Sequence, residues 1–293
     1  MLVSRLAFEK VAREMLELPI GSKQYSRERE KRVFRAAFGT SFEVCSELWS
    51  KLEPKKKISR RAQPKHLLWT LIYYKVNISE EMMIKIANCK SCDTFRDWVS
   101  KFTDGIADLE EVVIVWANRF NDWDGKCIAL VTVDGTDVWM WEPSPRSRIW
   151  WSHKHNRAAM RYEIAQCIQT GDIVAINGPF PANLSDREIF DANLSLMLMP
   201  GECVEADNGY SGRIQIKTNA VGKDSITRKQ KSVARGRHEN VNRRLKIFKV
   251  MERWESTNTE KHGKIARAVA VIVQLSFENG ARLYPVKYEV TYD

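Results

Sequence analysis

The spacing of apolar residues predicts a helical first part of the chain. Apolar residues recur at helical spacing from Leu2 to Leu18 and again from Phe34 to Cys45. Ser79 and Asp93 are typical N-cap residues and mark the starts of two later helices. Further helices are predicted over residues 64–75, 79–87 and 93–118. Short helices joined by tight turns resemble a DNA-binding helix-turn-helix arrangement, and a plain helical bundle gives the same pattern.

After residue 126 the pattern changes to strands alternating with helices. A near-continuous apolar run covers residues 127–133, which is typical of a buried strand. Strands are predicted over residues 127–133, 137–141, 162–168, 173–176 and 203–207, and helices over 185–198, 238–254 and 265–278. Such an order builds an α/β layer. We therefore predict a helical N-terminal region, residues 1–125, followed by an α/β domain, residues 126–293.

The charge balance of the chain favours a polyanionic partner. Lysine and arginine number 47 against 37 acidic residues, which gives a formal net charge of +10. Nucleic acid is the first candidate for such a partner, and the alternative is that the charge only keeps the protein soluble. The basic run PKKKISRR at residues 54–61 fits a nuclear localisation signal, a phosphate-binding loop or a solvated linker.

Cysteine use and hydropathy indicate a soluble protein of a reducing, intracellular compartment. Six cysteines in a chain of 293 residues do not form the dense pattern of a disulfide framework. Cys89 and Cys92 have the C-x-x-C spacing of a zinc or redox site, but no second pair follows at zinc-knuckle distance. The first 20 residues lack the apolar core of a signal peptide, and no apolar run is long enough to span a membrane.

Three acidic residues are the strongest candidates for chemistry. Asp134 and Asp207 each stand at the end of a predicted strand, and Glu239 opens a predicted helix. Carboxylates in these places can meet at one sheet edge and hold two divalent ions, for which Mg²⁺ with its preference for oxygen ligands is suited. The alternatives are ordinary turns at both aspartates and a surface salt bridge from Glu239 to Arg243.

The surroundings of Glu239 favour the metal site over the alternatives. Between Arg228 and Arg253 the chain has ten basic residues and two acidic ones, which suits a metal ligand beside a polyanion. On a helical wheel, Val241, Leu245 and Phe248 form an apolar stripe opposite Glu239. The residues predicted to bind phosphates are Lys154, Arg237, His238, Arg243 and Lys246. The basic tract 154–157 adjoins Trp150 and Trp151, which either stack on bases or pack in a core.

Several segments together resemble the motifs of Harbinger-type DDE superfamily transposases. They are VDGTD at 133–137, GDIV at 171–174, NGPFP at 177–181, SDREIF at 185–190, EADNGYSG at 205–212 and RHENVNRRLK at 237–246. The resemblance covers roughly residues 127–290. It implies a ribonuclease H-like catalytic fold and dependence on two divalent ions, Mg²⁺ or Mn²⁺. It also implies that Asp134, Asp207 and Glu239 are the catalytic triad.

The same resemblance implies a nuclear enzyme of cut-and-paste transposition. Such an enzyme hydrolyses phosphodiester bonds at transposon ends and transfers the strands to target DNA, acting on double-stranded DNA as a homo-oligomer, often with a Myb-like DNA-binding partner. Two alternatives remain: a domesticated, catalytically silent DNA- or protein-binding factor, and a repair or structure-specific nuclease of the same fold. Asp137 competes with Asp134 as a metal ligand, whereas Asp186 is expected to cap a helix.

Overall fold

The computed structural model describes residues 5–17, 26–52, 58, 60–218 and 224–290. Two compact units result, and each consists of several chain segments. The first unit comprises residues 1–113, 245–251 and 264–281, and the second comprises 114–244, 252–263 and 282–293. The domain boundary at residue 125 remains a prediction. None of the described helices combines the length and the apolar character needed to cross a membrane.

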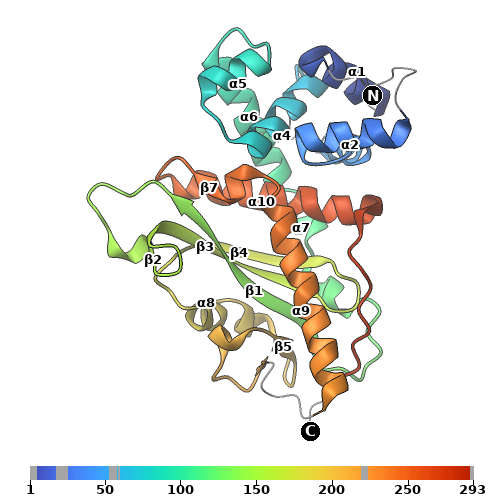
Figure 1. The fold of residues 1–293 in the computed structure, drawn as a ribbon, viewed down its shortest axis with the longest axis vertical. Coiled ribbons are helices and arrows are strands. Elements are labelled where there is room, and N and C mark those ends of the chain that lie inside the picture. The colour runs from blue at the N-terminus through green and yellow to red at the C-terminus, as the bar shows by residue number, and fades with distance from the viewer. Residues whose placement is uncertain (1–4, 18–25, 53–57, 59, 219–223, 291–293) are drawn as a thin grey trace. The chain divides into compact units, whose positions relative to one another are not determined.

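The first unit is helical, as the apolar spacing predicts. Its N-terminal helices are α1 (Arg5–Leu16), α2 (Arg27–Phe38), α3 (Phe42–Leu52), α4 (Pro64–Val76), α5 (Glu80–Ile86), α6 (Cys92–Ala107) and α7 (Glu110–Val113), and most of α10 (Thr259–Ser276) belongs to the same unit (Figure 1). Aromatic rings fill its core: Phe34 lies 4.0 Å from Phe42, centroid to centroid, and Trp49 lies 6.0 Å from Phe102. Ring burial of this kind contributes most of the stability of such a bundle.

Capping residues explain where these helices begin, and they correct two predictions. Ser79 caps α5 as predicted, because its side chain accepts a hydrogen bond from the Met82 amide. Ser91, rather than Asp93, caps α6. The helix predicted to reach residue 118 ends at Ala107 and is followed by α7 and a 3₁₀ helix, Trp116–Phe120. Most of the basic run 54–61 lies outside the described residues.

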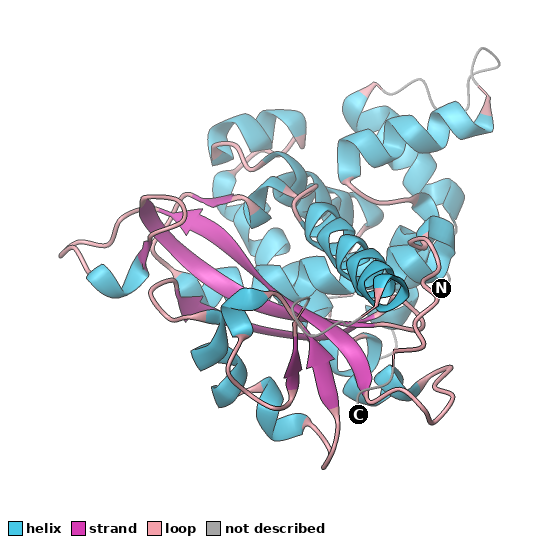
Figure 2. Ribbon diagram, turned by 60° about the horizontal axis from the view of Figure 1, so that its bottom comes forward, coloured by secondary structure: helices cyan, strands magenta, loops and turns pink. Residues whose placement is uncertain are grey.

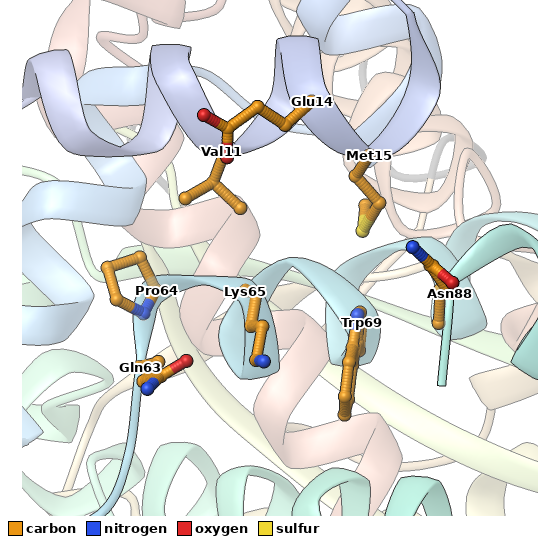
Figure 3. Close-up of a pocket in the computed structure, with 9 residues that line it drawn as sticks. Val11, Glu14, Met15, Gln63, Pro64, Lys65, Trp69 and Asn88 are labelled. Carbon is orange, nitrogen blue, oxygen red and sulfur yellow. The ribbon is translucent and has the colours of Figure 1, made fainter. Parts of the chain in front are cut away.

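A pocket of about 390 Å³ opens in the first unit between α1 and the first turns of α4. Figure 3 shows Glu14 and Met15 of α1 on one side, with Lys65 and Trp69 of α4 on the other. The Lys65 ammonium lies 5.6 Å from the centre of the Trp69 ring. None of the three predicted catalytic carboxylates belongs to this pocket.

The second unit is a mixed α/β fold built on a seven-stranded sheet. Its strands are β1 (Ala129–Met140), β2 (Trp151–Ser152), β3 (Arg157–Cys167), β4 (Ile173–Pro181), β5 (Cys203–Glu205), β6 (Ile216–Lys217) and β7 (Arg253–Trp254) (Figure 1). The central strand β1 pairs antiparallel with β3 and parallel with β5 and β7. This sheet with its flanking helices is consistent with the ribonuclease H-like fold that the sequence predicts.

Strand β1 is continuous where two strands and a turn were predicted. It pairs with β3 from Val131 to Trp139 without a break, and Asp134 lies opposite Ile164. The parallel pairing with β5 ends at Thr132. Asp134 therefore lies inside a strand rather than at its end, but just beyond the last residue that the neighbouring parallel strand covers. On this side of β1, Asp134 lies in the interval between the pairing with β5 and the pairing with β7, which begins at Trp139.

Helices α8 (Asp186–Ala192) and α9 (Ser225–Leu245) cover opposite faces of the sheet (Figure 2). Helix α9 contacts Thr132 and Asp134, whereas α8 reaches Gly135 through Asp186. Adjacent strand residues point to opposite faces, so these contacts place the helices on different sides. The core on the α8 side includes Val131, Val133 and Phe190.

Three helix predictions of the second half differ in extent from the structure. The helix predicted over 185–198 ends at Ala192, and a 3₁₀ helix, Leu194–Met197, follows. The helix predicted over 238–254 starts at Ser225 and ends at Leu245, so Glu239 lies within α9 rather than at its start. The last predicted helix, 265–278, is α10, Thr259–Ser276.

Candidate active site

Asp134, Asp207 and Glu239 line one small pocket of the second unit. They come from the middle of β1, from the turn after β5 and from α9, so the fold brings together groups that are far apart in the sequence. The pocket has a volume of about 30 Å³. That volume accommodates a particle of about the size of one water molecule.

Local hydrogen bonds fix both aspartates. The Gly135 amide donates to Asp134 Oδ1 at 2.9 Å, and the Asn242 side-chain amide donates to Asp134 Oδ2 at 2.8 Å. The Gly209 amide donates to Asp207 Oδ1 at 2.8 Å, so Asp207 caps the 3₁₀ helix Asn208–Tyr210. Asp207 therefore forms the turn that the alternative interpretation predicts and still presents its carboxylate to the pocket.

Glu239 lies on the exposed face of α9. Val241 and Leu245 are fully buried, which confirms the apolar stripe of the helical wheel, whereas Glu239 and Arg243 are exposed. No ion pair between Glu239 and Arg243 is present in the described part of the chain. The Glu239 side chain is exposed where it lines the pocket and is not packed in the core.

The carboxylates of the site affect one another electrostatically. Burial and, after it, the negative charge of Asp207 together raise the pKa of Asp134 to about 6. Asp186 acts in the same direction, whereas the exposed Lys154 lowers the pKa of Asp134. A cation among these groups relieves both the repulsion and the cost of burying charge.

The donor set fits divalent ions, but the pocket is not closed around one. Three carboxylates supply the oxygen ligands that Mg²⁺ and Mn²⁺ prefer. Over the described ranges, no three His, Cys, Asp or Glu side chains stand together closely enough to hold a metal ion as they are. Ligation by all three residues therefore requires side-chain rotation, for which the exposed Glu239 is the best placed.

Asp137 does not compete with Asp134, because its carboxylate is used elsewhere. Arg161 donates to it at 2.7 and 3.2 Å, and the Ser152 hydroxyl donates at 2.9 Å. Although burial acts to raise it, the hydrogen bond and the charge of Arg161 lower the pKa of Asp137. The side chain also points to the opposite face of β1 from Asp134.

Asp186 lies close to the candidate site, although the sequence predicts only a helix cap for it. Ser185, not Asp186, caps α8, and Asp186 is the first residue of the helix. Ser185 and Glu188 form a capping box. This signature is visible in the sequence and identifies Ser185, rather than Asp186, as the residue that caps the helix. A Cβ atom added to Gly135, the residue after Asp134, would lie 2.8 Å from Asp186 Oδ1.

The five predicted phosphate-binding residues divide by burial. Lys154 and Arg243 are exposed, and Lys246 is half-buried and belongs to the first unit. Arg237 is 2% exposed and donates to the carbonyl groups of Cys167 and Ile168. A side chain so enclosed does not reach a phosphate, so Arg237 does not fit its predicted role.

His238 is likewise an interior residue. It is 2% exposed, and its Nδ1 lies 2.8 Å from the Thr132 hydroxyl. Burial lowers the pKa of His238 to about 3, so the ring is neutral at physiological pH and carries no charge for a phosphate. Its contact joins α9 to β1 in the wall of the carboxylate pocket, which both His238 and Thr132 line, and a neutral ring held there does not fit the predicted phosphate-binding role.

Comparison with known proteins adds one finding to this geometry. Residues 133–276 match the family model described as DDE superfamily endonuclease. No curated protein and no solved structure matches the chain. The matched segment contains Asp134, Asp207 and Glu239. Together with the mixed α/β fold, the match supports a DDE-type transposase domain in this part of the chain.

Proposed function

We propose that the protein is a transposase of the Harbinger type, a metal-dependent DNA endonuclease that cuts transposon ends and transfers them to target DNA. The observation that carries the proposal is the meeting of Asp134, Asp207 and Glu239 at one pocket. All three lie inside the segment that matches the endonuclease family. Carboxylates from a strand, from the turn after the neighbouring strand and from a crossing helix are a suitable arrangement for phosphodiester chemistry.

Two divalent ions, Mg²⁺ or Mn²⁺, would be held by Asp134, Asp207 and Glu239. When bound, such ions lower the pKa of a water molecule and offset the charge that develops on the phosphate. The protein's own residues orient the ligands: Asn242 and the Gly135 amide fix the two oxygens of Asp134. The exposed Lys154 and Arg243 are available to bind DNA phosphates beside them.

The loop between β1 and β3 offers a surface for the DNA strand. A hollow of about 540 Å³ is lined by Arg146, Ser147, Arg148, Trp151 and His153. The Arg146 guanidinium lies 5.1 Å from the centre of the Trp151 ring. Cationic groups beside an aromatic face suit a phosphate backbone with an unpaired base. Lys154 continues the same loop, and its charge acts on Asp134, which links the hollow to the carboxylates.

The other parts of the proposal come from the family resemblance. They are action in the nucleus on transposon ends and target DNA, a homo-oligomeric assembly and a Myb-like DNA-binding partner. The helical N-terminal region, residues 1–125, is proposed as a DNA-binding region on the same basis. Two transposon ends have to be bound at the same time, which is the physical reason to expect an assembly of more than one protein chain.

Nicking of supercoiled plasmid DNA in the presence of Mn²⁺ tests the proposed activity. The variants Asp134→Ala, Asp207→Ala and Glu239→Gln are each expected to lose Mn²⁺-dependent nicking. Asp191→Asn is the matched control, because Asp191 is an acidic residue of α8 that pairs with Arg213 away from the pocket. Full activity in any purified triad variant removes that residue from the site.

The same preparation separates the proposal from its two alternatives. A domesticated, silent relative binds DNA but does not nick it when Mn²⁺ is added. A repair nuclease nicks DNA but does not join an oligonucleotide with a 3′-hydroxyl end to a target plasmid. Nicking followed by strand joining is the result that a transposase gives.

A further inference from the structure

Asp186 lies between two glycines that are close in sequence to the candidate aspartates: Gly135, which follows Asp134 within β1, and Gly209, two residues after Asp207. A Cβ on Gly135 would be 2.8 Å from Asp186 Oδ1, and a Cβ on Gly209 would be 3.0 Å from Asp186 Oδ2. The Gly209 position is also 3.0 Å from Asp207 Oδ1, so both carboxylates approach the same point. Glycine at these two places permits the close approach of the Asp186 side chain.

Arg161 holds Asp186 in this place. Its guanidinium donates to Asp186 Oδ1 at 3.1 Å and to the Leu184 carbonyl at 3.0 Å. The same guanidinium binds Asp137, which Ser152 also contacts. Arg161 thereby joins β3, β1 and the start of α8. A guanidinium with several fixed acceptors orients its carboxylate partners more firmly than a single ion pair does.

A second contact joins α8 to the Asp207 turn. The Tyr210 ring, which ends the 3₁₀ helix capped by Asp207, packs edge-to-face on Phe190 of α8 at a centroid distance of 6.3 Å. Both rings are buried, with exposures of 1% and 0%. Helix α8 is thus fixed against the Asp207 turn by an aromatic pair and against β1, beside Asp134, by Asp186.

We propose that Asp186 is a positioning residue of the carboxylate site. Wedged between Gly135 and Gly209 and held by Arg161, it sets the spacing between the part of β1 that carries Asp134 and the turn that carries Asp207. The inference rests on the proposed metal site, since the spacing matters only if the two aspartates share cations. Asp186 acts through the two aspartates and needs no contact with DNA.

Calorimetric titration of the full chain with Mn²⁺ alone tests this role. Asp186→Ala is expected to weaken Mn²⁺ binding by about 10- to 100-fold, the usual effect of losing a group that orients metal ligands. Asp186→Asn keeps the size of the side chain and an acceptor for Arg161, so its affinity should stay within a few-fold of wild type.

Asp191→Asn is the matched control for the loss of charge on α8. Asp191 has an arginine partner, Arg213, at 2.8 Å, and its side chain is 28% exposed against 27% for Asp186. Mn²⁺ affinity should not change in this variant. Melting temperatures in metal-free buffer show whether each variant is folded. If Asp186→Ala does not fold, Gly135→Ala tests the same spacing, because its new Cβ displaces Asp186, and a comparable loss of affinity is expected.

Two results would overturn the inference while leaving the metal site intact. The first is wild-type Mn²⁺ affinity in folded Asp186→Ala. The second is equal weakening in Asp186→Asn and Asp186→Ala, because charge near the ions, rather than spacing, would then be the cause. If the wild-type chain itself does not bind Mn²⁺, the proposed function fails first, and this inference fails with it.

Discussion

Asn242 shows how a single neutral side chain can set the geometry of the site. It lies one helical turn after Glu239 on α9 and donates to Asp134 Oδ2 at 2.8 Å. One residue therefore joins the helix that carries the glutamate to the strand that carries the first aspartate. A hydrogen bond to a ligating carboxylate fixes its orientation and its basicity.

Asn242→Ala is expected to lower Mn²⁺-dependent nicking by about 10- to 100-fold with little change in the folded fraction. Asn240→Ala is the control, because Asn240 is two residues away on the same helix and its side-chain amide donates to the Gly236 carbonyl of that helix. Nicking rates of the two purified variants are compared at saturating Mn²⁺. Equal rates in both variants would contradict the role of Asn242.

Glu163 is a buried acid that should make stability depend on pH. It is 1% exposed, and burial raises its pKa to about 8 from an ordinary value of 4.5. The folded protein holds the Glu163 proton more tightly than the unfolded chain does, and this contribution to folding stability is complete below pH 4.5. As the pH rises from 4.5 to about 8, the unfolded chain has already released the proton, so the contribution to stability is lost.

Glu163→Gln removes this dependence and keeps an acceptor for the Asn177 amide. The free energy of unfolding of the variant minus that of wild type should be larger at pH 8 than at pH 5, by an amount on the order of a few kcal/mol. Urea unfolding at both pH values measures the difference. Parallel pH profiles for the two proteins would show that the carboxyl is ionised in the folded state.

At the scale of single residues, the sequence identifies the candidate carboxylates better than it identifies what the basic residues contact. Asp134 and Asp207 are recognisable because each follows a buried apolar run. The basic tract around Glu239 suggests DNA contact for all its members, yet Arg237 and His238 are buried. Their burial depends on where α9 crosses the sheet, and a linear pattern does not contain that information.

At the scale of elements, a buried ion pair joins β5, which leads into the Asp207 turn, to α9, which carries Glu239. Lys231 of α9 and Glu205 of β5 have fully buried side chains 3.4 Å apart. The Tyr288 hydroxyl of the C-terminal segment donates to Glu205 Oε1 at 2.6 Å, and Lys231 also donates to the Thr218 carbonyl. Glu205 precedes Asp207 by two residues, so this network fixes the approach to the site.

Lys231→Met should destabilise the fold by about 3–5 kcal/mol, because it leaves the buried Glu205 charge without its cation. Adding Glu205→Gln should recover much of that loss, since glutamine removes the charge and keeps an acceptor for Tyr288. Urea unfolding of the two single variants and the double variant gives the coupling energy. Additive effects would mean that the two groups do not stabilise each other.

The extents of the elements were harder to predict than their types. The segment Asp134-Gly135-Thr136 has the composition of a turn, but pairing with β3 continues through it, Gly135 opposite Glu163. Helix α9 begins 13 residues earlier than predicted, at Ser225 instead of His238. Buried Lys231 and Arg237 hide its apolar face, because basic residues are counted as surface residues in a periodicity argument.

For the molecule as a whole, the formal charge of +10 is the property that bears most directly on function. Association with DNA releases counterions, so affinity falls as the salt concentration rises. Only exposed basic groups contribute to this effect. Because Arg237 is buried, the proposed DNA contacts of the second unit fall to exposed residues such as Lys154 and Arg243.

Lys154→Gln and Arg243→Gln should each lower the slope of log affinity against log salt by about 0.9 on double-stranded DNA, the effect of one phosphate contact. Lys287→Gln is the control, because this lysine is 77% exposed and lies outside the carboxylate pocket. Fluorescence anisotropy over a range of salt concentrations gives the slopes. Unchanged slopes in the first two variants would remove these residues from the DNA interface.

The location of bound Mn²⁺ is the most direct test of the site. Anomalous diffraction from crystals of the full chain grown with Mn²⁺ locates the ions independently of activity. We predict anomalous peaks between the carboxylates of Asp134, Asp207 and Glu239, with all three residues as ligands. Mn²⁺ bound elsewhere, or peaks that Glu239 does not contact at saturating Mn²⁺, would contradict the assignment.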